Sequence, residues 1–324
     1  MIQVNLNRRI ALAVCFFIVV SCVIMGTDPF HPQQTASSVE PPRTVDREFW
    51  FKIEAPRYAR GTGPIILIDE THNNFHTAEG TYWPFAELMR RDGYVVVSAK
   101  QALCRRVLDE CVVFVVADAQ PPSKEGALPT FSLPEIEILN SWVEDGGSLF
   151  LITDHMPDPG AIAGLALSFN IEMNNGYVLN GTLTGRERPI IFSHSTGDIL
   201  GDHAILRGRS PGERVEQVAT FAGSAFKAGE DFEPLLILGP GRRSWMPEKY
   251  WEFPAGTPNI SVAGWYQGGV KEFGKGKLAC FAEAAMFTAQ VFDSGNIKAG
   301  MNHPDARGNA RLLLNVMHWL TETQ

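Results

Sequence analysis

The side chains best suited to chemistry gather in two polar loops, each directly after a run of β-forming residues. Residues 65–68 lead into Asp69-Glu70-Thr71-His72-Asn73-Asn74-Phe75-His76, and residues 148–153 lead into Asp154-His155. In an open parallel sheet, loops at the carboxyl ends of the strands form the ligand crevice. We therefore expect one polar ligand site, whose predicted contacts are Asp69, His72, Asn73, His76, Asp154 and His155.

A metal ion is one ligand that these residues suit. Carboxylates and imidazoles bind zinc, iron and manganese, and His72 and His76 would lie on one face if the loop begins a helix. The predicted metal ligands are His72, His76, Asp154 and His155. In a hydrolase of this kind the predicted catalytic residues are Glu70, Asp154 and Glu283, with Glu70 or Glu283 as general base. A hydrogen-bonded polar crevice without metal fits the same residues.

Other motifs are weaker or missing. His203 follows Asp202 and precedes Arg207 and Arg209, which suits either an anionic or hydroxylated ligand or a turn held by internal ion pairs. No glycine-rich phosphate loop follows residues 65–68. A nucleotide cofactor is therefore disfavoured, while a divalent metal stays open. The net charge of -8, without a basic stripe, argues against nucleic acid as a partner.

Strand and helix patterns alternate through the first half of the chain. Strands are expected at 65–68, 94–98, 112–117 and 148–153, and helices at 82–91 and after the capping box Ser132–Glu135. This order predicts a three-layer α/β/α sandwich with a mainly parallel, doubly wound sheet. Residues 170–276 would add an antiparallel, loop-rich insertion, and a strand at 277–283 and a helix at 309–320 would complete a single domain over 51–324.

The N-terminal residues read as a targeting segment and a spacer. Arg8 and Arg9 precede an uncharged run over 10–25, so residues 1–29 are expected to be a signal peptide or membrane anchor. Val19-Val20-Ser21-Cys22 is similar to a lipobox, which makes Cys22 a candidate lipidation site. Residues 30–50 are rich in Pro, Gln and Ser and read as a flexible linker. We predict a membrane-anchored, extracytoplasmic protein. Cys104 and Cys111 are left open between free thiols and a disulfide.

Five segments carry a resemblance to a known superfamily: 69–76, 154–155, 201–203, 283–287 and 300–302. With them, residues 65–320 resemble the class I glutamine amidotransferase-like superfamily, whose fold is flavodoxin-like. Its nucleophilic cysteine sits in the elbow after the strand that matches 148–153. Here the elbow reads Thr153-Asp154-His155-Met156. The resemblance thus implies an uncharacterised non-amidotransferase family, which keeps the scaffold and lacks the nucleophile.

Three functions follow as hypotheses. The first is a membrane-tethered domain that binds a small polar ligand, a sugar or an envelope fragment, without amidotransferase activity. The second is a metal-assisted hydrolase. The third is a scaffold for a transporter or envelope protein complex, which would require an exposed apolar patch.

Overall fold

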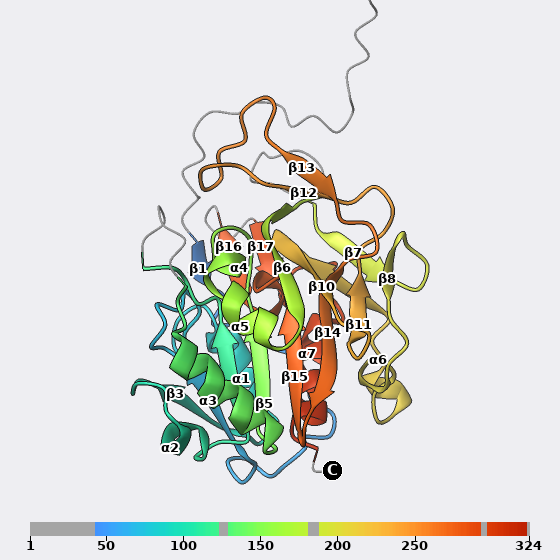
Figure 1. Cartoon of the computed structure of the whole chain (residues 1–324). Coiled ribbons are helices and arrows are strands. Elements are labelled where there is room, and N and C mark those ends of the chain that lie inside the picture. The colour runs from blue at the N-terminus through green and yellow to red at the C-terminus, as the bar shows by residue number, and fades with distance from the viewer. Residues whose placement is uncertain (1–42, 123–128, 181–187, 293–296, 323–324) are drawn as a thin grey trace, which may run out of the picture. The chain divides into compact units, whose positions relative to one another are not determined.

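The computed structural model of the chain describes residues 43–122, 129–180, 188–292 and 297–322 (Figure 1). The predicted leader over 1–29, with Cys22, and most of the predicted linker over 30–50 lie outside these ranges. Within them, no helix has the length and apolar character needed to cross a membrane.

One section of the main sheet is parallel. Its strands, in spatial order, are β3 (Val95–Ala99), β2 (Ile65–Asp69), β4 (Val113–Ala117), β5 (Ser148–Ile152) and β15 (Gly276–Phe281). The residues of β4, β5 and β15 are all buried. Short, continuous apolar runs of this kind suit strands that are covered on both faces. The carboxyl ends of β2, β4 and β5 therefore meet at one edge of the sheet.

Helices cover this section from both sides. Phe85 and Met89 of α1 (Trp83–Arg91) and Leu313 of α7 (Asn309–Leu320) belong to the core on one face. The other face is covered by α2 (Arg105–Leu108), α3 (Leu133–Glu144) and α5 (Ala163–Ser168). Figure 1 shows α3 and α5 in front of the sheet and α7 behind β15. The capping box of α3 forms as expected, since the Ser132 backbone N–H donates to Glu135 Oε2 at 2.9 Å.

The rest of the main sheet is antiparallel apart from one short pairing. β14 (Tyr266–Phe273) pairs with β15 and leads to β10 (Gly223–Ala228), β6 (Ile171–Val178), β12 (Arg243–Trp245) and β13 (Asn259–Ser261). β11 (Glu233–Ile237) joins β14 to β8 (Asp198–Leu200), and β7 (Ile190–Ser193) pairs with both β8, in parallel, and β9 (Gln217–Thr220). A separate small sheet contains β1 (Arg43–Val45), β16 (Ala289–Phe292) and β17 (Ile297–Gly300).

Short helical turns complete the described chain: α4 (Asp158–Ala161), α6 (Ala204–Arg207), η1 (Pro211–Glu213) and η2 (Ala285–Phe287).

The predicted three-layer α/β/α sandwich with a mainly parallel sheet is wrong. The main sheet has 14 strands and is mixed, most of its pairings are antiparallel, and helices are few. The alternation of strands and helices ends at β5. After α4 and α5, which follow β5, only short helical turns lie between the described strands up to β17, and antiparallel neighbours need no crossover helix. These strands continue the sheet through β15 and β14 and are not confined to an insertion at its edge.

Cys104 and Cys111 are free thiols, as is the buried Cys280. Of the two alternatives that the sequence left open, the structure has the unpaired one.

Candidate metal centre

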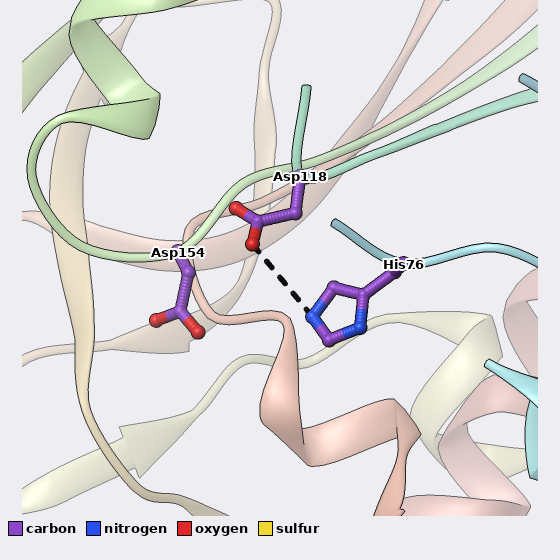
Figure 2. Close-up of side chains that lie close together, drawn as sticks. All are labelled: His76, Asp118 and Asp154. Atoms are coloured by element: carbon purple, nitrogen blue, oxygen red, sulfur yellow. Dashed lines mark ion pairs between the residues drawn. The ribbon is translucent and has the colours of Figure 1, made fainter. Parts of the chain in front are cut away.

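Three side chains with metal-binding atoms converge at the carboxyl ends of the parallel strands. His76 lies in the loop after β2, Asp118 directly follows β4, and Asp154 lies in the loop after β5. One ligand atom from each lies within 4.8 Å of the other two, and His76 Nε2 is 3.8 Å from Asp118 Oδ2. Figure 2 shows Asp118 and His76 pointing toward each other, with Asp154 on the neighbouring loop. His76 and Asp118 are buried, and Asp154 is half-buried.

Backbone hydrogen bonds hold the two loops that carry His76 and Asp118 together. The Phe75 N–H donates to the Asp118 carbonyl at 3.0 Å, next to an isolated β-bridge between Asn74 and Ala119. The Asp118 N–H in turn donates to the carbonyl of Ile152, the last residue of β5. Asp118 has a φ of 55°, in the left-handed region that Asp and Asn enter more readily than most residues. That turn directs the chain away from β4 at the site.

The His76 ring is fixed by Thr81 and Tyr82. Its Nδ1 lies 2.7 Å from Thr81 Oγ1, and its ring stacks on Tyr82 at 4.3 Å. The Thr81 hydroxyl is positioned to donate to the Phe75 carbonyl at 3.4 Å, which leaves its oxygen to accept the His76 Nδ1–H. Burial, together with the charge of Arg43, holds the pKa of His76 well below its ordinary value. The neutral ring then presents the Nε2 lone pair to Asp118.

A lone pair that faces a carboxylate is unfavourable unless a proton or a metal cation lies between them. Metal-binding histidines commonly donate their second ring N–H to an oxygen, and Thr81 Oγ1 is placed to accept such a bond from His76 Nδ1. Two atoms bound to the same ion at about 2.0–2.2 Å lie at most roughly 4.4 Å apart. The 4.8 Å cluster therefore closes around an ion with a small side-chain rotation. One imidazole and two carboxylates suit zinc, manganese or iron.

The cluster opens into a cavity of about 50 Å³. The residues that line it are Arg43, Phe75, His76, Asp118, Gln120, Asp154, His155, Asp158 and Tyr250. Asp158, at the start of α4, shares a hydrogen bond with Asp118 and receives another from Gln120. Burial and the charge of Asp118 raise the pKa of Asp158 well above its ordinary value. A proton between these two carboxyl groups accounts for their contact.

His155 forms a wall of the same cavity. Its ring stacks on Tyr177 at 4.5 Å and meets the edge of Trp251 at 4.9 Å. Its Nδ1–H donates to the Met156 carbonyl at 3.0 Å, so Nε2 is the nitrogen able to accept a hydrogen bond or bind an ion. Tyr250 lies beside it, 5.6 Å from ring to ring. These rings give the cavity one aromatic side.

The structure does not bring the predicted ligand His72 to this cluster. Its Nδ1 is 2.7 Å from Asp69 Oδ2, and its Nε2 is 3.4 Å from Glu135 Oε1. Burial alone would lower the pKa of His72, but the hydrogen bond and charge of Asp69, with Glu135, outweigh it and raise the pKa. The loop does not begin a helix at residues 72–76, where Asn73 takes a φ of 52°. His72 and His76 therefore do not share a helical face.

The other predicted site residues have structural partners. Glu70 accepts hydrogen bonds from the Ala78 N–H and from Ser98 Oγ, at 3.0 and 2.7 Å. Asn73 donates to the Pro121 carbonyl, and His203 caps α6 through the Ile205 N–H. Glu283 is fully buried, accepts from the Met286 N–H at 2.7 Å, and has its pKa raised to about 7, above all by burial.

Asp118 is the ligand candidate that the sequence analysis missed. Asp118 directly follows a predicted strand, much as Asp69 and Asp154 do. That position at a strand end could have marked it as a site residue. No histidine lies next to Asp118 in the sequence, so the loop lacks the Asp–His pattern that marked the loop with Asp154 and His155.

No protein-family model and no curated protein match the chain. Solved structures do match it. The "mmIFT52 N-terminal domain" is 16% identical over 80% of this chain and 98% of that one, with a TM-score of 0.57. Cytoplasmic protein STM1381 from Salmonella typhimurium LT2 is 14% identical over 80% and 99%, with a TM-score of 0.48. A putative ThuA-like protein from Bacteroides uniformis is 14% identical over 84% and 94%, with a TM-score of 0.45.

The likeness to the mmIFT52 domain shows a shared fold and nothing more. The expected membership of the class I glutamine amidotransferase-like, flavodoxin-like superfamily is wrong. The chain carries a large mixed sheet in place of the expected mainly parallel one, and the fold that it shares at a TM-score of 0.57 is that of the mmIFT52 N-terminal domain.

Proposed function

We propose that this domain is a metal-dependent hydrolase that acts on a small polar substrate. The observation that carries the proposal is the convergence of a neutral imidazole and two carboxylates in one cavity at the strand ends. His76 Nε2, Asp118 and Asp154 would hold the ion. A divalent cation in such a place lowers the pKa of a bound water and polarises a carbonyl or phosphoryl oxygen.

The chain's own residues set the geometry of this chemistry. Thr81 fixes the His76 ring, and the hydrogen bond from Asp158 orients the Asp118 carboxyl group. Such partners of the ligands tune affinity and orientation in metal sites. His155 and Tyr250 form the wall on which the bound substrate would rest.

The size of the cavity favours a reacting group over a whole sugar. Pockets that enclose a small-molecule ligand measure roughly 300–1,000 Å³, whereas this one measures about 50 Å³. Only the reacting end of a substrate would enter it. The first hypothesis from the sequence was binding of a sugar or envelope fragment without reaction. It is the alternative that the experiment must distinguish from hydrolysis.

The experiment measures bound metal and turnover on the full chain. Elemental analysis should find one zinc, manganese or iron per chain, lost in His76→Gln and Asp118→Asn and kept in the control His203→Gln. Metal-loaded protein should hydrolyse at least one of a panel of p-nitrophenyl esters, phosphates and glycosides, and EDTA should stop it. If the protein binds the ion but turns over none of these substrates, it is a binding protein, and the proposed hydrolase activity is refuted. Protein that takes up no ion at millimolar metal would refute the site itself.

A further inference from the structure

His72 is a buried imidazole, outside the proposed metal cluster, that faces a carboxylate on each side. Its Nδ1 lies 2.7 Å from Asp69 Oδ2 at the end of β2, and its Nε2 lies 3.4 Å from Glu135 Oε1 in the first turn of α3. The ring stacks on Phe131 at 4.0 Å, and the side chain is 6% exposed. A carboxylate can only accept, so both contacts need an N–H, and a histidine has two ring N–H groups only when it is charged.

Both carboxylates are held in place by other partners. Asp69 Oδ1 accepts from the N–H and the hydroxyl of Thr71, at 3.1 and 2.8 Å. Glu135 Oε2 accepts from the N–H and the hydroxyl of Ser132, at 2.9 and 2.7 Å, which forms the capping box of α3. If His72 loses the proton on Nε2, its lone pair faces Glu135 Oε1, and Glu135 cannot turn away without giving up the helix cap.

The charges around His72 favour the protonated ring. Asp69, at the end of β2, and Glu135, on α3, are the charged groups that face it. Burial by itself lowers the pKa of His72, but the hydrogen bond and charge of Asp69, together with those of Glu135, raise the pKa above its ordinary value of 6.5. The stabilisation from this contact is therefore fully present below pH 6.5 and is lost as the pH rises through the higher pKa of the folded state.

We propose that His72 is a pH-sensitive latch that joins the loop after β2 to the N-terminus of α3. With a proton on both nitrogens, the ring bridges the two elements. Without the second proton, the contact with Glu135 is lost and the loop is held by its remaining bonds, such as that from the Phe75 N–H to the Asp118 carbonyl. Phe75 and His76 of this loop line the cavity, so the latch sets the mobility of one of its walls. The latch needs no metal and goes beyond the proposed hydrolase activity.

The first test is an NMR titration of the histidine rings of the full-length protein in EDTA, with the His72 signal assigned by its loss in His72→Gln. The pKa of His72 should lie above 6.5. Glu135→Gln removes the charge but keeps a side chain that suits a capping box, and it should lower the pKa of His72 by about 0.5 or more. A pKa at or below 6.5, or one that Glu135→Gln leaves unchanged, would overturn the inference.

The second test measures hydrogen exchange of the loop in EDTA, at pH 5.5 and pH 8.5, with the effect of pH on intrinsic exchange removed. Exchange over residues 69–76 should rise roughly threefold or more between the two pH values in the wild type. In His72→Gln and in Glu135→Gln it should be fast at both. Exchange that does not rise in the wild type, or that rises as much in Glu135→Gln, would show that the contact does not act as a latch.

His203→Gln is the matched control. His203 also lies near a carboxylate, with Nε2 3.5 Å from Glu233 Oε2, but its Nδ1 accepts from the Ile205 N–H and faces no second acid. The exchange of residues 69–76 in this variant should match the wild type at both pH values. If His203→Gln abolished the pH response of the loop, the response would not belong to His72, and the inference would be wrong. Because both tests are made in EDTA, their outcome does not depend on the proposed metal site.

Discussion

Neutralising Asp118 should reverse the order of stability between variant and wild type, depending on metal. Without an ion, Asp118 and Asp154 bring two carboxylates together at the edge of the sheet, which costs stability. With an ion, the same two groups are what binds it. Asp118→Asn keeps the shape of the side chain and tolerates the left-handed backbone at this position. The variant should thus be more stable than the wild type in EDTA and less stable in saturating metal.

The magnitude follows from the separation of the charges. Two unit charges at 4.8 Å, the upper limit of the separation between the ligand atoms here, interact by about 3.5 kcal/mol at an effective dielectric constant of about 20. Removing one of them should raise the free energy of unfolding in EDTA by up to that amount, which is roughly 5–10 °C in Tm for a domain of this size. A ligand at 1,000 times its Kd stabilises the wild type by about 4 kcal/mol, and the variant should lack most of this gain.

Thermal unfolding, followed by circular dichroism at pH 7.5, measures both effects: the gain in stability of the variant in EDTA, and its smaller stabilisation by 1 mM manganese. Asp202→Asn is the control, since Asp202 is 89% exposed and pairs only at the surface with Arg207; its Tm should hardly change in either buffer. A variant Asp118→Asn that is less stable than the wild type in both buffers would refute the reasoning, because the carboxylate would then be a structural partner and not a ligand.

Three further predictions concern Glu283, Thr81 and the leader. Burial raises the pKa of Glu283 from 4.5 to about 7, so its contribution to stability is fully present below pH 4.5 and is lost as the pH rises through 7. Chemical denaturation from pH 5 to 8 should therefore show a shallower decline for Glu283→Gln, by up to about 3 kcal/mol; an unchanged slope would mean that Glu283 titrates normally. Thr81→Val should weaken manganese binding by roughly 10–100-fold, since it removes the partner of His76 Nδ1, while Thr62→Val, at an exposed hydroxyl, should not; equal affinities would remove Thr81 from the site. Fractionation of cells that express a tagged full-length chain should place it with the membrane and outside the cytoplasm, and recovery from the soluble cytosol would contradict the predicted leader.

Local signals predicted single elements well. The capping box at Ser132 marked the start of α3, and the final helix spans Asn309–Leu320 as its apolar spacing indicated. The run at 65–68 forms β2. The predicted arrangement of these elements in the sheet was wrong. Alternation fixes partners only where a crossover helix separates two strands, and between β6 and β17 the described chain has only short helical turns of three or four residues.

The sequence indicated where the candidate site lies better than it indicated which residues form it. Strand ends located His76, Asp154 and His155 in one cavity. Spacing alone could not show that Asn73 leaves the helical region, or that Asp69 turns back to hold His72 three residues later. The position of Asp118 at a strand end was a signal in the sequence, but its contact with the His76 loop depends on the bridge between Asn74 and Ala119, which are far apart in the sequence.

The most direct test of the central claim is anomalous diffraction from crystals of the protein grown with manganese. We predict one strong anomalous peak, at about 2.0–2.2 Å from His76 Nε2 and from carboxylate oxygens of Asp118 and Asp154. A peak between Asp69, His72 and Glu135, or none at saturating manganese, would contradict it.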